Sequence, residues 1–244
     1  MGGTANTPSG STETRYTANG FTNASASGEG ILEGLLTSCA GSITYTNGKF
    51  NLFVGGDQTA SLTITDEDVI GDISISTKSG SGELYNTVKS IFVDADSKYE
   101  TMEAPVYENA TYLAADTPSG EASANYKKIM ELQFPFTVSQ TMAQRLGAIS
   151  LDRQRQTSTI SLLTTLEYMK LQPNDWVNVT NSRMSYSSKT FEVISTNLEF
   201  AENDGQIFAA TRLTLQEIDT TIYDYDAGNY IDYVAEGVDT PGGS

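Results

Sequence analysis

The densest run of acidic side chains lies between two segments that have the alternating pattern of β-strands. It comprises Asp66, Glu67, Asp68 and, shortly after them, Asp72. Two carboxyl groups can hydrolyse a glycosidic bond, one as the acid and the other as the nucleophile or base, if their environments separate their pKa values. Nothing in the sequence around these residues raises one pKa over another. A solvated connection between strands is therefore favoured, and a hydrolase with paired carboxylates is kept as an alternative.

A second acidic pattern, Asp94-Ala-Asp96, has the spacing of sites that bind a metal or a nucleotide sugar. A calcium loop also needs a glycine for its sharp turn and a glutamate at its distal end. Both are missing here, and Lys98 stands where a further acid would be wanted. The pattern favours a solvated loop, so no metal site is predicted.

Histidine is absent from the chain, and Cys39 is its one cysteine. Histidine is the commonest general base near neutral pH and the commonest metal ligand. A cysteine nucleophile needs such a base beside it, and one thiol cannot form an intrachain disulfide or a thiolate cluster. Cys39 is therefore interpreted as a small core residue. The sequence predicts a protein that is not an enzyme and that uses no cofactor or metal.

The charge balance is strongly acidic, with 14 Lys and Arg against 31 Asp and Glu and a formal charge of −17. Proteins that hold nucleic acid neutralise its phosphates with basic side chains. Stable nucleic-acid binding is therefore not expected, although DNA could pass such a surface without being held. No apolar run approaches the roughly 20 residues that span a bilayer, so we expect no membrane-spanning segment.

Residues 15–56 predict a small α+β domain made of a helix and a hairpin, after a flexible Gly/Ser/Thr-rich arm at 1–14. The helix carries an apolar stripe from Ile31 to Cys39 at helical spacing. Asn47-Gly48 favours a two-residue hairpin turn, because both positions need a positive φ. This turn places Tyr45 opposite Phe50 and Ile43 opposite Leu52, all on one side of the ribbon. We expect the helical stripe to cover that side.

The range 57–216 reads mainly as strands, with a helix at about 139–154. The apolar residues of this helix, Val138, Met142, Leu146 and Ile149, lie on one stripe. Its C-terminal half is basic, which suits the negative end of the helix dipole. The arginines there are Arg145, Arg153 and Arg155. They are usually a solvated helix end, and the alternative is a set of salt bridges to an acidic neighbour.

The last segment, 217–244, is an acidic tail with seven acids and no Lys or Arg. Acids without a compensating base repel one another, so we expect this segment not to fold alone. Tyrosines offer the kind of contact area that interfaces favour. The candidate subunit interface therefore combines the three arginines with Tyr223, Tyr225, Tyr230 and Tyr233.

Several motifs occur in an order that resembles a family of viral proteins. They are Arg15-Tyr-Thr-Ala-Asn-Gly20, Tyr45-Thr-Asn-Gly-Lys-Phe50, Ile64-Thr-Asp-Glu-Asp-Val-Ile-Gly-Asp-Ile-Ser74, Leu132-Gln-Phe-Pro-Phe136, Ala143-Gln-Arg-Leu146, Pro173-Asn-Asp-Trp-Val177 and Leu215-Gln-Glu217. Each is weak alone, and their order over about 15–226 carries the match. The chain resembles the middle region of the lambda host-specificity protein and its relatives, the central tail-tip or baseplate hub proteins of long-tailed bacteriophages. Relative to that family, an N-terminal barrel and the long C-terminal receptor-contacting regions have no counterpart in this chain.

The resemblance implies a mainly β, α+β protein with a tail-tube-like β-barrel domain, one packed helix and the small helix–hairpin domain beside it. It implies a structural virion protein at the distal end of the tail, synthesised in the host cytoplasm, that assembles as a homotrimer and caps the tail tube. The implied partners are distal tail or tube proteins, the tape measure protein, and tail fibre or spike proteins. DNA would only pass through, and the acidic residues 66–68 and 72 would line the channel. A receptor- or carbohydrate-binding β module of the tail is the alternative.

Overall fold

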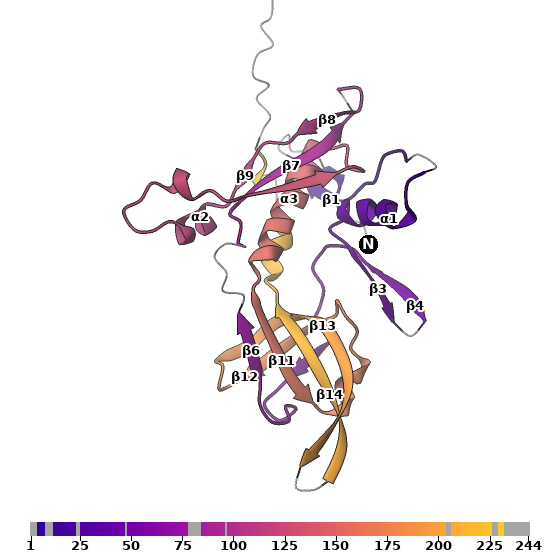
Figure 1. Ribbon diagram of the computed structural model, residues 1–244, viewed down its shortest axis with the longest axis vertical. Coiled ribbons are helices and arrows are strands. Elements are labelled where there is room, and N and C mark those ends of the chain that lie inside the picture. The colour runs from indigo at the N-terminus through magenta and orange to yellow at the C-terminus, as the bar shows by residue number, and fades with distance from the viewer. Residues whose placement is uncertain are drawn as a thin grey trace, which may run out of the picture. The chain divides into compact units, whose positions relative to one another are not determined.

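The computed structural model describes residues 4–7, 12–22, 25–46, 48–77, 84–95, 97–203, 206–225 and 229–231. The chain forms two compact units, and each combines segments that are far apart in the sequence (Figure 1). The first unit comprises Met1–Ser38, Asn86–Ala148 and Tyr225–Ser244, and the second comprises Cys39–Tyr85 and Ile149–Asp224. The predicted mainly β, α+β class is confirmed. The continuous ranges 15–56 and 57–216 stay a prediction of domains.

The first unit is built on a sheet in which β7 pairs with three other strands. Its described elements are β1 (Thr4–Asn6), β2 (Thr12–Thr14), α1 (Gly28–Thr37), β7 (Thr87–Asp94), β8 (Glu100–Glu103), β9 (Tyr107–Glu108), α2 (Ala110–Asp116), η1 (Ser123–Tyr126), β10 (Ile129–Phe134) and the beginning of α3 (Gln140–Arg155). Strand β10 runs parallel to β7, while β8 and β9 pair with β7 antiparallel. Val88, Phe92 and Phe134 are buried in this unit. In the predicted flexible arm, β1 and β2 instead form an antiparallel ribbon.

Helix α1 begins at a serine cap and packs through a glycine. The Ser27 side chain accepts a hydrogen bond from the backbone N–H of Gly30, which satisfies one free donor of the first turn. Gly34 is the buried residue of the helix. A Cβ atom on Gly34 would lie 2.6 Å from a ring carbon of Phe136, and one on Gly20 would also lie 2.6 Å from that ring. The Phe136 ring therefore occupies space that exists because both positions are glycine.

We expect Gly34→Ala to lower the free energy of unfolding by about 2 kcal/mol, the usual cost of overpacking. A helix-interior alanine normally stabilises by about 1 kcal/mol relative to glycine, so the sign of the effect reports the contact with Phe136. Gly28→Ala is the matched control, because no atom lies within 4 Å of its added Cβ. Urea denaturation measures both variants. A stabilised Gly34→Ala protein would contradict the packing described.

The second unit contains a six-stranded sheet in the order β5-β12-β13-β14-β11-β6. Its described elements are β3 (Ser42–Thr46), β4 (Lys49–Phe53), β5 (Leu62–Ile64), β6 (Ser74–Thr77), the end of α3, β11 (Ser158–Thr164), η2 (Leu166–Lys170), β12 (Trp176–Asn181), β13 (Tyr186–Asn203), β14 (Gln206–Glu217) and η3 (Thr220–Tyr223). One face of the sheet forms a single core with η2. That core comprises Ile64, Ile160, Leu162, Tyr168, Leu171, Val177, Val179, Phe191, Val193, Leu213 and Leu215. Because strands across the sheet share this cluster, the sheet curls around its own core.

A smaller core in the second unit fixes the chain after β14. Ile218, Ile222 and Tyr223 are buried against Ile149 of α3 and Trp176 of β12. The rings of Trp176 and Tyr223 are stacked, with centroids 6.1 Å apart and planes inclined by 26°. The first part of the predicted acidic tail therefore packs in the core of its own chain, because its apolar residues alternate with the acids.

The hairpin of β3 and β4 has the predicted register, with Tyr45 opposite Phe50 and Ile43 opposite Leu52. Asn47, the first turn residue, lies outside the described part, and Gly48 has the expected positive φ of 78°. Tyr45, Phe50 and Leu52 are 66%, 74% and 61% exposed. Cover of this apolar side by the helical stripe stays a prediction.

Candidate functional site

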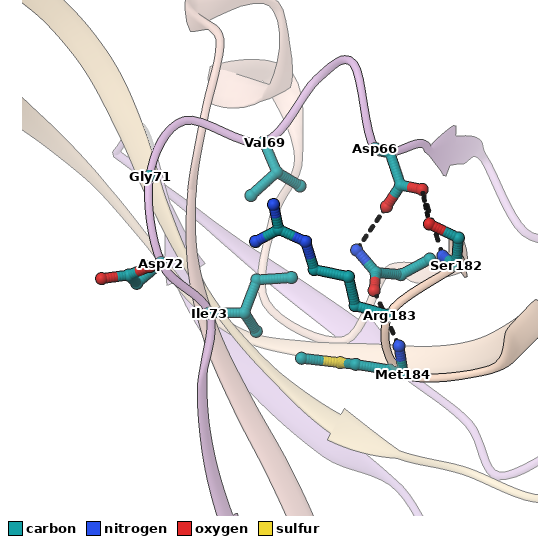
Figure 2. A pocket seen from close by; sticks show the side chains of 9 residues that line it. Asp66, Val69, Gly71, Asp72, Ile73, Ser182, Arg183 and Met184 are labelled. Atoms are coloured by element: carbon teal, nitrogen blue, oxygen red, sulfur yellow. Dashed lines mark hydrogen bonds between the residues drawn. The ribbon is translucent and has the colours of Figure 1, made fainter.

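The acidic loop that follows β5 is tied to the turn between β12 and β13. The Asp66 carboxylate accepts hydrogen bonds from the Asn181 side chain and from the backbone N–H (3.1 Å) and hydroxyl (2.7 Å) of Ser182 (Figure 2). Asp68 accepts from the backbone N–H (2.8 Å) and hydroxyl (2.7 Å) of Thr65. These carboxylates therefore satisfy backbone and side-chain donors of two neighbouring turns.

The electrostatics of this loop are unlike those of a pair of catalytic carboxylates. Hydrogen bonds from the Ser182 hydroxyl and backbone hold the pKa of Asp66 below its ordinary value. For Asp68, partial burial raises the pKa, but hydrogen bonds from Thr65 and Tyr168 outweigh burial and the pKa is lowered. A glycosidase needs one carboxyl group with a raised pKa to act as the acid. The two shifts run in the opposite direction, which argues against the hydrolase alternative.

An open cavity of about 410 Å³ lies beside this loop. Asp66, Asp72 and Arg183 contribute to its wall together with apolar side chains that include Val69 and Ile73. Figure 2 shows Arg183 extending toward Val69, while the Asp72 carboxylate points away from the Arg183 guanidinium. Asp66, Glu67 and Asp72 are exposed. The structure thus brings the four predicted acids into one loop, and their place in a channel stays a prediction.

We expect Asp66→Asn to destabilise the protein near neutral pH and to have a smaller effect in acid. The folded-state pKa of Asp66 is lowered, so the carboxylate stabilises the fold above its unfolded pKa of about 3.9. That contribution is lost as the pH falls through the still lower folded pKa. Urea denaturation at about pH 7 and pH 3 measures the difference between the two proteins.

Glu67→Gln is the control for this prediction. Glu67 is exposed, and within the part of the chain that the structure describes its carboxylate makes no hydrogen bond. We expect it to leave the free energy of unfolding nearly unchanged at both pH values. An Asp66→Asn effect of the same size in acid and at neutral pH would exclude the carboxylate charge as its cause.

Arg153 of α3 links two segments of the second unit, strand β13 through Glu192 and the short helix η3 through Tyr223. Its Nη2 donates to both oxygens of Glu192, at 2.9 and 2.6 Å, and its Nη1 donates to the Tyr223 hydroxyl at 2.9 Å. Burial raises the pKa of Glu192, and Arg153 lowers it, with burial dominant. Nearby, Arg155 Nε donates to the Tyr85 carbonyl at 2.6 Å. This end of α3 is therefore tied to its own chain.

Arg145 lies at the centre of a polar cluster in the first unit and is fully buried. Its Nη1 donates to Glu13 Oε1 at 3.0 Å and to the Tyr230 hydroxyl, and its Nη2 donates to the Arg15 carbonyl at 2.5 Å. Burial raises the pKa of the Tyr230 hydroxyl, against the opposing effect of Arg145. The cluster holds the N-terminal ribbon and the segment around Tyr230 on α3.

Tyr225, Tyr230 and Ile231 also pack within the first unit, through ring contacts and hydrogen bonds to a side-chain amide. The Tyr225 ring meets Tyr107 and Tyr230 edge to face, at 5.7 and 4.9 Å between centroids. The Gln144 side chain forms two hydrogen bonds with the backbone of Ile231, both 2.9 Å long. Tyr233 lies outside the described residues. The predicted interface residues thus make contacts within one chain, and their role between subunits stays a prediction.

Sequence reasoning missed the acids that pair with the arginines. Glu13 stands in the segment predicted to be a flexible arm, and Glu192 stands inside a strand candidate. Both pairings join residues far apart in the sequence, so no local pattern identifies them. The signal that was present is the single acid of residues 1–14, Glu13, because a buried charge needs a partner. Glu192 shares its strand candidate with Glu199, so the sequence does not distinguish the two.

The described residues offer no metal site and no membrane-spanning helix. No group of three or more His, Cys, Asp or Glu residues there could hold a metal ion. None of the helices in that part of the chain is both long enough and apolar enough to cross a membrane.

Comparisons with known proteins identify the family. The chain is 25% identical over 194 residues to baseplate hub protein pb3 of Escherichia phage T5, covering 79% of this chain and 18% of that protein. A chain of the virion of a native gene transfer agent particle matches with a TM-score of 0.60 and 13% identity, covering 83% of this chain and 41% of the other, which shows a shared fold. The chain thus spans less than half of either protein. The family model described as putative phage tail protein matches residues 27–194, and the chain belongs to this family.

Proposed function

We propose that this phage tail protein is a structural component of the tail-tip or baseplate hub, at the distal end of the virion's tail. The observation that carries the proposal is the similarity to a baseplate hub protein over 79% of the chain. The mainly β architecture, and hydrogen bonds and ion pairs that join distant segments of the chain, suit a rigid structural part. In this role the chain caps the tail tube and contacts distal tail or tube proteins, the tape measure protein, and tail fibre or spike proteins.

The hub forms part of the channel through which DNA leaves the particle. The acidic character of the chain supports this role, because a wall of like charge lets a polyanion slide past without trapping it. The exposed carboxylates of Asp66, Glu67 and Asp72, with the neighbouring Asp68, are the candidates for this lining. Because Asp66 and Asp68 also bond to neighbouring turns, the test replaces only Glu67 and Asp72 by lysine. The change creates sites that hold phosphate and therefore slows genome ejection, most strongly at low salt.

The copies of the chain form a homotrimer. The six-stranded sheet ends in β5 on one side and β6 on the other. Unpaired strand edges readily pair with another chain, and a ring of identical contacts closes them. The Arg145, Arg153 and Arg155 region and the acidic, tyrosine-rich segment from 217 onward are the proposed subunit interface.

Native mass measurement of isolated tail tips, together with averaged images of them, tests the proposal. Three copies of the chain at the distal end of the tail are expected. Six copies, or a position along the tail shaft, would contradict the hub assignment. A particle with three copies but unchanged ejection after the lysine substitutions at Glu67 and Asp72 would exclude the channel lining alone.

A further inference from the structure

The β13–β14 ribbon continues beyond the sheet as an arm that keeps an apolar face (Figure 1). The pair Thr196 and Leu213 lies on the core face of the sheet, where Leu213 is fully buried. Cross-strand partners share a face and alternate pairs point the same way, so Leu198 and Phe200 continue that face outward. They are 50% and 71% exposed. The arm therefore carries the side of the sheet that elsewhere forms the core, and among the described residues its apolar side chains on that side are exposed.

The β3–β4 hairpin of the same unit also has an exposed apolar face, and it is attached to this unit through the opposite face. Its polar face is attached to the loop before β12: the Ser42 hydroxyl donates to Asn174 Oδ1, and Asn51 Nδ2 donates to Gln172 Oε1, both at 3.0 Å. Ser42 and Asn51 point to the side opposite Tyr45 and Phe50. These bonds leave the aromatic pair, whose ring centroids are 4.9 Å apart, on the side of the hairpin away from the loop before β12.

Both ribbons are unusual because each exposes apolar side chains on a protein with a large net negative charge. A two-stranded ribbon alone is marginally stable in water, and contiguous apolar surface with a polar rim marks a contact with another molecule. The hairpin segment 39–56 contains no acid and one base, Lys49, in a chain of net charge −17. The arm segment 196–213 contains three acids, Glu199, Glu202 and Asp204, against Arg212. Their charges are therefore complementary, while two hairpins or two arms would not attract each other.

We propose that the apolar face of the β3–β4 hairpin of one copy packs on the apolar face of the β13–β14 arm of a second copy. The contact gives the proposed homotrimer a specific interface and rests on that proposal. Each copy would insert its own hairpin into one neighbour and receive the hairpin of the other neighbour on its arm. Such a head-to-tail contact joins different surfaces of the two copies, and a rotation that closes gives a ring. Tyr45 and Phe50 are its aromatic anchors, and Phe200 and Ile207 form the surface that receives them.

Disulfide trapping between two distinguishable copies tests the contact. One variant carries Phe50→Cys and the other Phe200→Cys, both in a Cys39→Ala background and with tags of different length. The two are co-expressed with the other tail proteins, assembled, and oxidised mildly, and the products are separated without reductant. A mixed dimer in high yield is expected. Thr46→Cys, on the opposite side of the hairpin, replaces Phe50→Cys as the matched control and is expected to give little mixed product.

The outcomes separate this contact from the hub proposal. In assemblies that contain three copies, the absence of mixed dimer would overturn the hairpin–arm contact and leave the trimer standing. Disulfide-linked homodimers of the Phe50→Cys variant as the sole product would do the same. Copies that do not associate at all would overturn both. A second measurement avoids engineered cysteines: Phe50→Ser and Phe200→Ser each weaken self-association by about 30-fold, the size expected for an aromatic hot spot. The side chains are exposed, so circular dichroism should show unchanged folding, and unchanged association would also overturn the contact.

Discussion

Replacing Arg145 by methionine is expected to lower the free energy of unfolding by about 4 kcal/mol, the usual cost of breaking a buried ion pair from one side. Methionine fills a similar volume but donates no hydrogen bond. The carboxylate of Glu13, the Tyr230 hydroxyl and the Arg15 carbonyl then lose the Arg145 donor together. Glu13 keeps the neutral hydroxyl donors of Ser139 and Thr141 but loses its cation. Because Arg145 is fully buried and the side chain of Glu13 is only 23% exposed, water replaces little of what is lost.

A double-mutant comparison identifies the ionic part of this loss. Glu13→Gln in the Arg145→Met background removes the unpaired charge, so the double variant should recover at least about 1 kcal/mol relative to Arg145→Met alone. Tyr230→Phe, which removes one hydroxyl, should cost about 1 kcal/mol. Guanidinium denaturation followed by circular dichroism measures all of them. An Arg145→Met protein within 1 kcal/mol of the original would show that the cluster does not hold this unit together.

Local chemistry explains what could be predicted about the fold. The β3–β4 register follows from Asn47-Gly48 and the alternation of apolar residues on both sides of it, all within twelve residues. Helix α3 was expected at 139–154 and spans Gln140–Arg155, because its apolar stripe is strongly periodic. Most strands of the second unit follow from their alternating pattern in the same way.

Pairings between distant segments could not be predicted in this way. The parallel pairing of β10 with β7 joins residues about forty positions apart and leaves no local signature. Helix α2 was missed, since the only helix predicted in 57–216 is the one at about 139–154. Its signal was present: Asn109 caps the helix by accepting from the backbone N–H groups of Thr111 and Tyr112, ahead of an alanine-containing run. The segment is short, and its polar surroundings masked it.

In the candidate site, too, the features that are local in sequence could be predicted and the pairings between distant residues could not. The acidic loop was found as a cluster because its four acids are neighbours in the sequence. Its hydrogen-bond donors, Asn181 and Ser182, lie more than a hundred residues away and were not foreseen. The arginines of α3 were interpreted as a solvated helix end, with salt bridges to an acidic neighbour as the alternative. Glu13 and Glu192, the acids that pair with Arg145 and Arg153 in the same chain, were not identified. The sequence indicates which charged residues could form ion pairs, but it does not indicate which distant residue each of them will contact.

Tyr223→Ala is expected to lower the free energy of unfolding by about 3 kcal/mol, because truncating a buried aromatic leaves a cavity in the second unit. Tyr223 is 3% exposed, stacks on Trp176 and accepts a hydrogen bond from Arg153. Trp176 is the one tryptophan of the chain, so its fluorescence reports unfolding at the site of the change. Tyr223→Phe keeps the ring and loses the hydroxyl, and should cost about 1 kcal/mol.

The two Tyr223 variants also separate packing from assembly. If Tyr223 acts through the core of its own chain, Tyr223→Ala destabilises a monomer in dilute solution, and Tyr223→Phe assembles normally. A residue at a subunit interface gives the reverse pattern, with a stable monomer and impaired assembly, because the free side chain would then be solvated. Tyr225, in the first unit, is the comparison, since its hydroxyl donates to the Asn229 carbonyl and its ring meets Tyr107 and Tyr230. If the Tyr223→Ala monomer were as stable as the original, the stacked Trp176–Tyr223 pair would not contribute to holding the end of β14 in place.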